Sequence, residues 1–584
     1  MTWIPAKVGN YQRTACETLG LPAATSSDPS HYLGTFKIAE CPAALQAATL
    51  RRRQIVDREI DDLLRLPLFE EGDHELNSFI ERNAYFLYDE FLKWVRRIDA
   101  IDQNTGVTAS RLQQLYRPYK HTRDWGGYLN YLCDVVPEFA ATLFAEIGAR
   151  ISERDRHRHS YIVSWAGNER RELLKLLIHG YVTRPDIPAA IVVIDPHGDL
   201  AKQVSRWEEF ASNDRLVYID PFLTPNASPV LNPLDVGKSM NSGGRVGTLD
   251  IVAQHLATTF ADLLRDRLTG NATHDLRTML LPCLLTLLDA EQGTLRALQN
   301  FMDDRKNESL IALGRQSARP QIAEFFTDEF HAPAYKEIRW AIHNKIQNAF
   351  HSPAFFNLVN GESSIDLAQA IEQQKIIVIN LAKGAMGDDA SEMIGRMIIA
   401  NILSIVLHQL NSGGKRTPVH LFVDECHHYM GSDLEILFER GDRYQLHLTL
   451  AQSGCGQGLP PHLQTLLLMN AHLKFAGHAA DDQRMAKQMG VDEGSMRMLQ
   501  SKEFFCQIGN HPTFKLRPAE HIHAERHCMA AEDWEKVKER QTNEYYRLLP
   551  EKTSLEKPSD SVLSSNAVSN AVSNAVESNA TGKS

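Results

Sequence analysis

The sequence predicts an α/β fold with a mainly parallel sheet, an inserted all-helical domain and an all-helical N-terminal region. Short and wholly apolar segments, such as 190–194 and 376–379, have the composition of strands that are buried on both faces. A strand, a loop, a helix and a second strand follow one another from 160 to 195, which is the spacing of a βαβ unit. Residues 245–368 lose the strand pattern and show helical periodicity instead.

Composition limits the classes of protein that this chain can belong to. Its 584 residues are enough for roughly three to four domains. A net charge of −11 argues against a surface coated in positive charge for nucleic acid, although a local basic path stays open. The eight cysteines form no CxxC pair, so we expect them to be reduced.

We expect a cytoplasmic location and no membrane span. The N-terminus lacks the apolar core of a signal peptide. The longest apolar runs, Met279–Leu288 and Met397–Leu407, are too short to cross a bilayer and predict buried helices. A role at a membrane would therefore need a partner.

Taken in order, the elements divide the chain into six parts. Residues 1–43 are expected to be loosely structured, and 44–154 to form a helical N-terminal domain. The basic clusters 51–53 and 96–97 fit solvated helix faces better than a DNA-binding surface. Residues 155–244 and 369–548 supply the two parts of the α/β domain, and 245–368 form the helical insertion. Residues 549–584, with SNAV repeats at Ser565, Ser569 and Ser573, predict a disordered tail.

Two carboxylates stand at the end of one predicted strand. The apolar run Val419–Val423 leads directly into Asp424 and Glu425, the place where parallel sheets bind ligands. Asp424 could hold Mg²⁺ through water, and Glu425 could orient an attacking water, so both are the catalytic candidates. The alternative is an acidic strand end that caps the next helix.

Six segments, in this order and spacing, resemble one family. They are the strand–loop–helix at 160–178, IDPHGDL at 194–200, NPL at 232–234, NLAKGAMG at 380–387, VDECHHYM at 423–430 and HLTLAQ at 447–452. Together they resemble the HerA–FtsK superfamily of hexameric P-loop motor ATPases, and most of all the conjugative type IV secretion coupling proteins and their soluble relatives. The resemblance implies a RecA-like ATPase domain, ATP and Mg²⁺ as cofactors, and a ring around DNA.

The phosphate loop departs from the family pattern GxxxxGK[ST]. The aligned residues are Ser164, Trp165, Ala166, Gly167, Asn168, Glu169, Arg170 and Arg171. Ser164 and Glu169 replace the two glycines, Arg170 replaces the lysine, and Arg171 replaces the hydroxyl that holds Mg²⁺. A glutamate forced to positive φ would cost ~1–2 kcal/mol, and its charge would repel a phosphate by ~4 kcal/mol at 4 Å. We therefore do not expect ordinary Mg·ATP hydrolysis, although some anion could still bind here.

The remaining candidates follow from the same alignment. Asp195 and His197 are intact accessory residues, and Gln452 is the candidate γ-phosphate sensor, one position earlier than the family's glutamine. Arg440 or Arg443 could replace the arginine that reaches a neighbouring subunit, since Asp442 occupies its position. The DNA-contact candidates, Arg265, Arg267 and Arg277, flank a loop of the insertion that could equally be a plain surface loop.

No metal site is expected. The cluster His521, His523, His527 and Cys528 matches no common zinc-ligand spacing.

Three functional hypotheses remain open. The first is a pseudo-ATPase subunit of a homo- or hetero-oligomeric ring that handles DNA, with an intact paralogue or a nuclease or secretion partner. The second is an active ATP-driven motor that uses Arg170 and Arg171 on the phosphates. The third is an interaction scaffold with no DNA role, which the acidic net charge favours.

Overall fold

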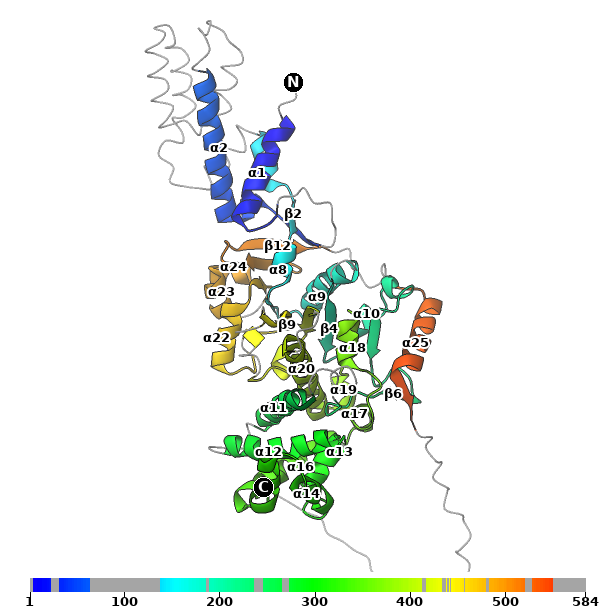
Figure 1. The fold of residues 1–584 in the computed structure, drawn as a ribbon. Coiled ribbons are helices and arrows are strands. Elements are labelled where there is room, and N and C mark those ends of the chain that lie inside the picture. The colour runs from blue at the N-terminus through cyan, green and yellow to red at the C-terminus, as the bar shows by residue number, and fades with distance from the viewer. Residues whose placement is uncertain are drawn as a thin grey trace, which may run out of the picture.

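One twisted sheet of eleven strands organises the molecule (Figure 1). The computed structural model describes residues 4–22, 31–63, 137–184, 188–235, 245–264, 272–291, 293–411, 416–432 and 437–549, the last with gaps at 439–440, 442, 456, 479–482 and 520–527. The strand order is β2-β1-β12-β11-β10-β3-β9-β8-β4-β7-β5.

Seven neighbouring strands of the sheet are parallel to one another. They are β10 (Leu473–Ala476), β3 (Ser160–Val163), β9 (Leu446–Gln452), β8 (Val419–Val423), β4 (Ala190–Asp195), β7 (Ile376–Asn380) and β5 (Leu216–Ile219). Every residue of these strands is buried, which explains their continuous apolar sequences. The predicted α/β class with a mainly parallel sheet is confirmed.

The other four strands are antiparallel and lie at one edge. They are β11 (Phe504–Ile508), β12 (Phe514–Pro518), β1 (Tyr32–Phe36) and β2 (Ile147–Arg150). The N-terminal region therefore differs from the prediction. Residues 1–43 contain α1 (Ile4–Thr18) and β1 rather than loose structure, and 44–154 contain β2 as well as α2 (Pro42–Leu63) and α7 (Pro137–Phe144).

The partner of β1 explains why local sequence patterns missed it. Gly34 pairs with Pro518, and a Cβ at Gly34 would lie 1.9 Å from the carbonyl oxygen of Arg517. Only glycine permits this approach. The pairing joins segments separated by most of the chain, so no short window of sequence records it.

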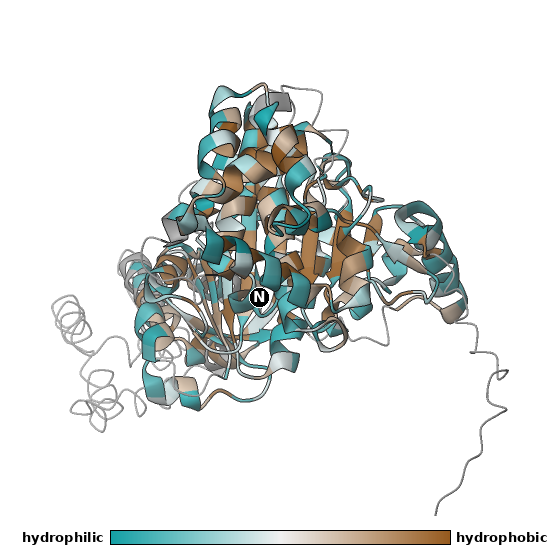
Figure 2. Cartoon of the chain, turned by 90° about the horizontal axis from the view of Figure 1, so that it is seen from below, coloured by the Kyte–Doolittle hydropathy of each residue, from teal (hydrophilic) through white to brown (hydrophobic). Residues whose placement is uncertain are grey.

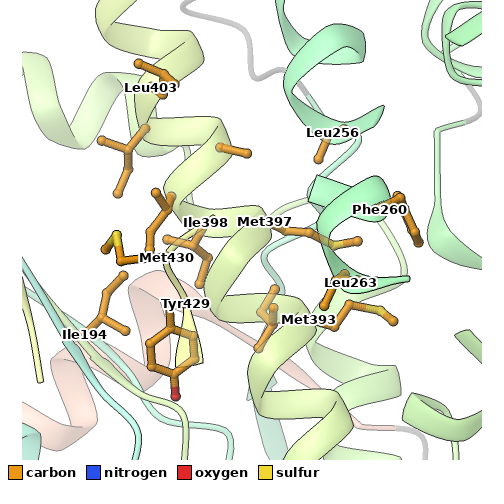
Figure 3. Packing of buried hydrophobic residues seen from close by; sticks show 14 of the residues in the cluster. Ile194, Leu256, Phe260, Leu263, Met393, Met397, Ile398, Leu403, Tyr429 and Met430 are labelled. Carbon is orange, nitrogen blue, oxygen red and sulfur yellow. The ribbon is translucent and has the colours of Figure 1, made fainter. Parts of the chain in front are cut away.

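Helices cover both faces of the sheet. On one face α9 (Gly167–Val182) and α10 (Asp199–Val204) share a hydrophobic core with Ile191 and Val193. On the other face α20 (Asp388–Asn411) shares a core with Val192 and Ile194, and α11 (Arg245–Leu263) packs against α20. Figure 3 shows Met393 and Met397 of α20 facing Leu256 and Phe260 of α11. The strands form the apolar interior, and the hydrophilic residues lie mainly on the outer helices (Figure 2).

Between β6 (Ala227–Pro229) and β7 the described residues form helices and no strand. They are α11, α12 (Ala272–Asp289), α13 (Leu295–Phe301), α14 (Glu308–Arg315), α15 (Pro320–Glu324), α16 (Lys336–Ala349), α17 (Pro353–Val359) and α18 (Leu367–Glu372), with short 3-10 and π segments. Phe301 and Phe326 stack inside this bundle and Phe330 lies tilted against both rings; the bundle lies below the sheet in Figure 1.

α20 is the one described helix that is long and apolar enough to cross a membrane. In this fold 78% of its most apolar stretch is buried, between the sheet and the insertion. Burial in the protein core is therefore enough to explain the apolar composition of α20.

The C-terminal part closes the α/β domain. α19 (Lys383–Met386), α22 (Pro461–Asn470), α23 (Gln483–Met489) and α24 (Glu493–Arg497) connect its later strands, and α25 (Ala531–Tyr545) and β13 (Tyr546–Leu548) follow, with β13 paired to β6. The basic pair at 96–97, the histidines at 521, 523 and 527, and the tail beyond 549 lie outside the described residues.

Candidate nucleotide-type site

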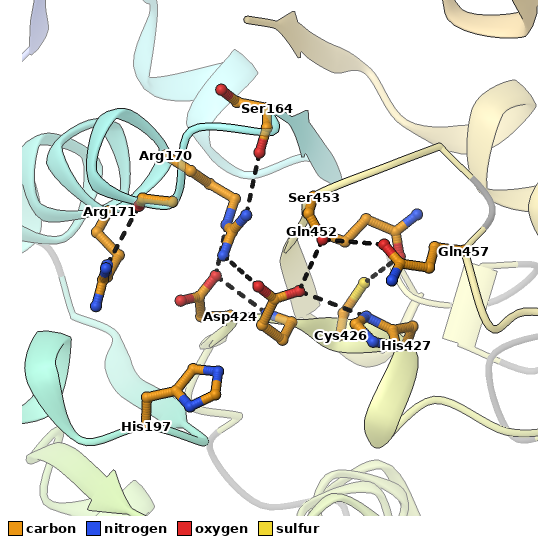
Figure 4. A network of polar contacts seen from close by, with 12 residues as sticks. Ser164, Arg170, Arg171, His197, Asp424, Cys426, His427, Gln452, Ser453 and Gln457 are labelled. Atoms are coloured by element: carbon orange, nitrogen blue, oxygen red, sulfur yellow. Dashed lines mark hydrogen bonds and ion pairs between the residues drawn. The ribbon is translucent and has the colours of Figure 1, made fainter. Parts of the chain in front are cut away.

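The carboxyl ends of the parallel strands bring together residues from five distant parts of the sequence. Ser164 follows β3, Asp424 follows β8, and Gln452, Asp195 and Asn380 end β9, β4 and β7. Because these strands are parallel, their carboxyl ends meet at one edge, where open α/β sheets place ligands. Figure 4 shows that Arg170, from α9, enters this group of side chains.

Arg170 binds both predicted catalytic carboxylates. Its Nε donates to Asp424 Oδ1 at 2.8 Å, and its Nη2 donates to Glu425 Oε1 at 2.6 Å. Its third nitrogen, Nη1, donates to the carbonyl oxygen of Ser164 at 3.1 Å. The side chain is only 3% exposed, and that of Asp424 is 1% exposed. A guanidinium thus lies where the sequence motif predicts a hydrated Mg²⁺.

The charges at this edge depend on one another. Burial raises the pKa of Asp424, the nearby Asp195 and Glu425 raise it further, and Arg170 opposes that rise only in part. Burial would lower the pKa of Arg170, but the two carboxylates hold it above its ordinary value. The arginine therefore stays charged, and it is the group that makes a buried carboxylate tolerable at this place.

The loop before α9 is too short to wrap a phosphate. Ser164, Trp165 and Ala166 alone separate β3 from α9. Two of their amides are engaged, since Ser164 N donates to Gln452 O at 3.2 Å and Trp165 N donates to His478 O at 3.0 Å. Ser164 fits at the first glycine position because Gly477 faces it: a Cβ on Gly477 would lie 2.6 Å from Ser164 Oγ.

The prediction that Glu169 is forced to positive φ is wrong. Glu169 lies in the first turn of α9, because the helix begins at Gly167, two positions before the family's second glycine. Its carboxylate accepts hydrogen bonds from Ser501 Oγ at 2.7 Å and Lys502 N at 3.0 Å. Its charge is thus engaged by the loop before β11.

Arg171 does not reach the carboxylate pair either. Its guanidinium donates to Asp199 Oδ2 at 2.6 Å, Asn168 Oδ1 at 2.9 Å and Gly167 O at 3.2 Å. The side chain is 23% exposed. Arg171 therefore fastens the start of α9 to α10.

The accessory residue Asp195 has a structural task. Its two oxygens accept from His197 N and Ala201 N, both at 2.9 Å, which fixes the turn from β4 into α10. Gly198, at φ +89°, completes that turn, and a Cβ there would lie 2.4 Å from Asn380 Oδ1. His197 is exposed and lies apart from the polar network in Figure 4.

Glu425 connects Arg170 to two further polar side chains, those of His427 and Ser453. Its backbone adopts φ +46°, a left-handed conformation that costs a non-glycine residue energy and is often found at functional sites. Oε2 lies 3.5 Å from His427 Nδ1 and 3.4 Å from Ser453 Oγ. Ser453 was not among the site residues predicted from the sequence. Its position one residue beyond Gln452, the predicted γ-phosphate sensor, could have indicated it.

Gln452 is fully engaged by its neighbours. Nε2 donates to Tyr161 Oη and, at 2.8 Å, to Gly454 O, and Oε1 accepts from Cys426 Sγ at 3.4 Å. The residue is 0% exposed. Its side chain joins β9, β3 and the turn after β8.

Replacing Gln452 with alanine is expected to destabilise this edge of the sheet by about 1–3 kcal/mol, since buried polar partners lose their bonds. The measurement is hydrogen exchange of peptides that cover β3 and β9. Gln457→Ala is the matched control, because Gln457 is exposed and its side chain accepts a hydrogen bond from Ser453 Oγ at 3.0 Å. Equal protection in both variants would contradict the structural role of Gln452.

The remaining candidates lie away from this edge or outside the described residues. Arg443 is exposed and precedes β9, so it lies at the amino edge of the sheet. Arg277 is exposed on α12. Arg440, Arg265 and Arg267 lie outside the described residues. Within the part of the chain that the structure describes, no group of His, Cys, Asp and Glu side chains is arranged to hold a metal ion.

Solved structures of a conjugative coupling protein are similar to this chain. Unbound bacterial conjugative coupling protein TrwB matches with 12% identity and a TM-score of 0.46, covering 64% of this chain and 87% of that one. Plasmid coupling protein TrwB in complex with ADP and Mg²⁺ matches with 13% identity and a TM-score of 0.46, covering 65% and 89%. No protein-family model and no curated protein sequence matches.

Proposed function

We propose that this chain is a cytoplasmic, DNA-translocase-type subunit of the coupling-protein kind that has become a pseudo-ATPase, acting within a DNA-handling or secretion-like complex. The observation that carries the proposal is the binding of Arg170 to both Asp424 and Glu425. The guanidinium of Arg170 binds the two carboxylates that, in a motor ATPase, would hold Mg²⁺ and orient the attacking water.

Mg·ATP binding would have to displace this arginine. Two charge-assisted hydrogen bonds would break, and Mg²⁺ would find no hydroxyl, because Arg171 stands at that position. The loop offers few free amides in exchange, since those of Ser164 and Trp165 already bind carbonyl oxygens. The residues present therefore fit ATP and Mg²⁺ poorly, and we expect the arrangement in which Arg170 binds Asp424 and Glu425 to be favoured over nucleotide binding.

The scaffold keeps what a ring subunit needs. The parallel sheet and helical insertion have the order expected of this class of motor. A mixed ring with an intact paralogue would allow such a subunit to bind DNA or a partner while its neighbours hydrolyse ATP. A homo-oligomeric ring would instead act as a passive clamp.

Purified full-length protein is expected to show no saturable Mg·ATP binding up to about millimolar concentration, the range of weak affinities. Binding is measured by calorimetry, and ATP turnover with and without single- and double-stranded DNA. Arg170→Ala tests whether the arginine is the only obstacle, and Glu425→Gln identifies genuine turnover. DNA-stimulated hydrolysis that Glu425→Gln abolishes would refute the pseudo-ATPase.

One observation favours an active motor as the second candidate. The amino end of α9 has no side-chain cap, so its first-turn amides are available to a phosphate if the Arg170 side chain turns from the carboxylates toward that phosphate. In that case wild-type turnover would be lost in Arg170→Ala as well as in Glu425→Gln. A scaffold without a DNA role is distinguished by filter binding at low salt, where it would show no affinity and no steep salt dependence.

A further inference from the structure

The outer edge of β5 is covered by side chains instead of a strand. β5 is the last strand of the eleven-stranded sheet, and β7 is the one described strand that pairs with it. The carbonyl oxygen of Arg215 accepts from Ile376 N of β7 at 2.7 Å, so the odd-numbered residues turn their backbone groups toward β7. The even-numbered residues Leu216, Tyr218 and Asp220 therefore turn theirs outward.

Two side chains of the C-terminal segment satisfy these outward groups. Gln541 of α25 donates from Nε2 to Leu216 O at 2.9 Å and accepts at Oε1 from Tyr218 N at 2.7 Å. Tyr546 Oη, at the start of β13, donates to Tyr218 O at 2.9 Å and accepts from Asp220 N at 3.2 Å. Gln541 and Tyr546 are both buried. They take the place of a neighbouring strand, and we call the segment α25–β13 that carries them the edge cap.

Few buried side chains attach the edge cap to the rest of the protein. Of the 15 residues of α25, the buried ones are Trp534, Val537 and Gln541. In β13, which pairs with β6, Tyr546 is buried and the two residues after it are exposed. Segments that bury little apolar surface open locally at a smaller free energy than the core of a sheet does. We therefore expect the edge cap to open while the sheet stays folded.

We propose that β5 is a self-association strand, which the edge cap covers and which pairs with β5 of a second copy of this chain when the cap opens. An uncovered strand edge offers a row of unpaired backbone groups to another strand, and proteins cover such edges in several ways. Here the cover consists of side chains on a separate segment, so it can leave without breaking the sheet. The proposal rests on this edge and not on the nucleotide-type site, so it holds for a pseudo-ATPase and for an active motor alike.

A second copy fits because the outward groups of β5 are self-complementary in one antiparallel register. With Tyr218 opposite Tyr218 of the second copy, each donates its N–H to the carbonyl oxygen of the other. Leu216 O then accepts from the N–H of Asp220 of the second copy, so each backbone group that the edge cap satisfies regains a partner. Val217 lies opposite Ile219 of the second copy, a pair of β-branched residues that stabilises a sheet. The contact has two-fold symmetry, so the same surface serves both copies.

Loosening the edge cap is expected to make the full-length protein associate more strongly. Gln541→Leu removes both hydrogen bonds to β5, and Tyr546→Phe removes a single hydroxyl group. If either change makes the cap open about tenfold more readily, as loss of a buried hydrogen bond allows, the dimer Kd falls about a hundredfold, because both copies must open. Sedimentation velocity over a range of protein concentrations measures this Kd. Asn543→Ala, exposed on the same helix, is the matched control and should behave as the wild type does.

Hydrogen exchange shows whether the association uses β5. In Gln541→Leu at low protein concentration, the amides of Tyr218 and Asp220 should exchange faster than in the wild type, and they should regain protection as dimers form. Association through any other surface, a ring included, leaves these two amides unprotected at every concentration. Tyr546→Phe, which keeps the aromatic ring, carries the same test if Gln541→Leu does not fold. The proposal is overturned if neither variant associates more strongly than Asn543→Ala, or if association leaves Tyr218 and Asp220 unprotected.

Discussion

Replacing Arg170 with alanine is expected to lower the free energy of unfolding of the sheet by about 3–5 kcal/mol, because it leaves a buried carboxylate pair without its cation. The loss should grow as pH rises. Burial already raises the pKa of Asp424, and the variant lacks the guanidinium of Arg170 that opposes that rise. A carboxylate with a raised folded-state pKa contributes stability that is present below the unfolded pKa and lost as pH rises through the folded value.

The experiment compares hydrogen exchange of peptides from β3 and β8 in Arg170→Ala and Arg171→Ala at pH 5 and pH 8. Arg171 is partly exposed and pairs with an exposed carboxylate, so its removal should cost at most about 1 kcal/mol. The double variant Arg170→Met with Asp424→Asn should recover much of the loss, because no unpaired charge of Asp424 remains. Similar behaviour of the two single variants would show that Arg170 is not the internal cation.

Acidification from pH 7 to pH 5 is expected to destabilise the amino edge of the sheet by about 2 kcal/mol for each buried histidine that stays neutral. Burial, followed by the nearby histidines and arginines, lowers the pKa of His420 well below its ordinary value and that of His447 to about 3. A depressed folded-state pKa means that the unfolded chain takes up the proton first. Stability is therefore lost as pH falls below about 6.5, the ordinary histidine pKa.

The geometry explains why these rings resist protonation. The rings of His157, His420 and His447 lie 4.8–5.4 Å apart, and Arg156 lies over the ring of Tyr181, which contacts His420. His420 Nε2 and His447 Nδ1 have no hydrogen-bond partner among the described residues. A second charge among these groups would meet repulsion and no compensation.

The variant His447→Gln carries one titrating group fewer, so its stability should fall less steeply between pH 7 and pH 5. Hydrogen exchange of peptides from β8 and β9 measures the slope, and His462→Gln, at an exposed position of α22, is the control. An unchanged slope in His447→Gln would mean that this ring is protonated in the folded protein.

By itself the sequence determined the parallel sheet, because strands buried on both faces must be apolar throughout, and it located Asp424 and Glu425 at the end of one such strand. It also showed that the phosphate loop was altered. These features are local, so a short window of residues records them.

Only the tertiary structure decided what the altered loop does. Arg170 is separated from Asp424 by 254 positions, and no sequence pattern says that its guanidinium turns toward the carboxylates rather than toward a phosphate. The same holds for Gln452, whose partners come from three elements. Pairing of side chains across a fold is set by packing, which joins residues that the chain order keeps apart.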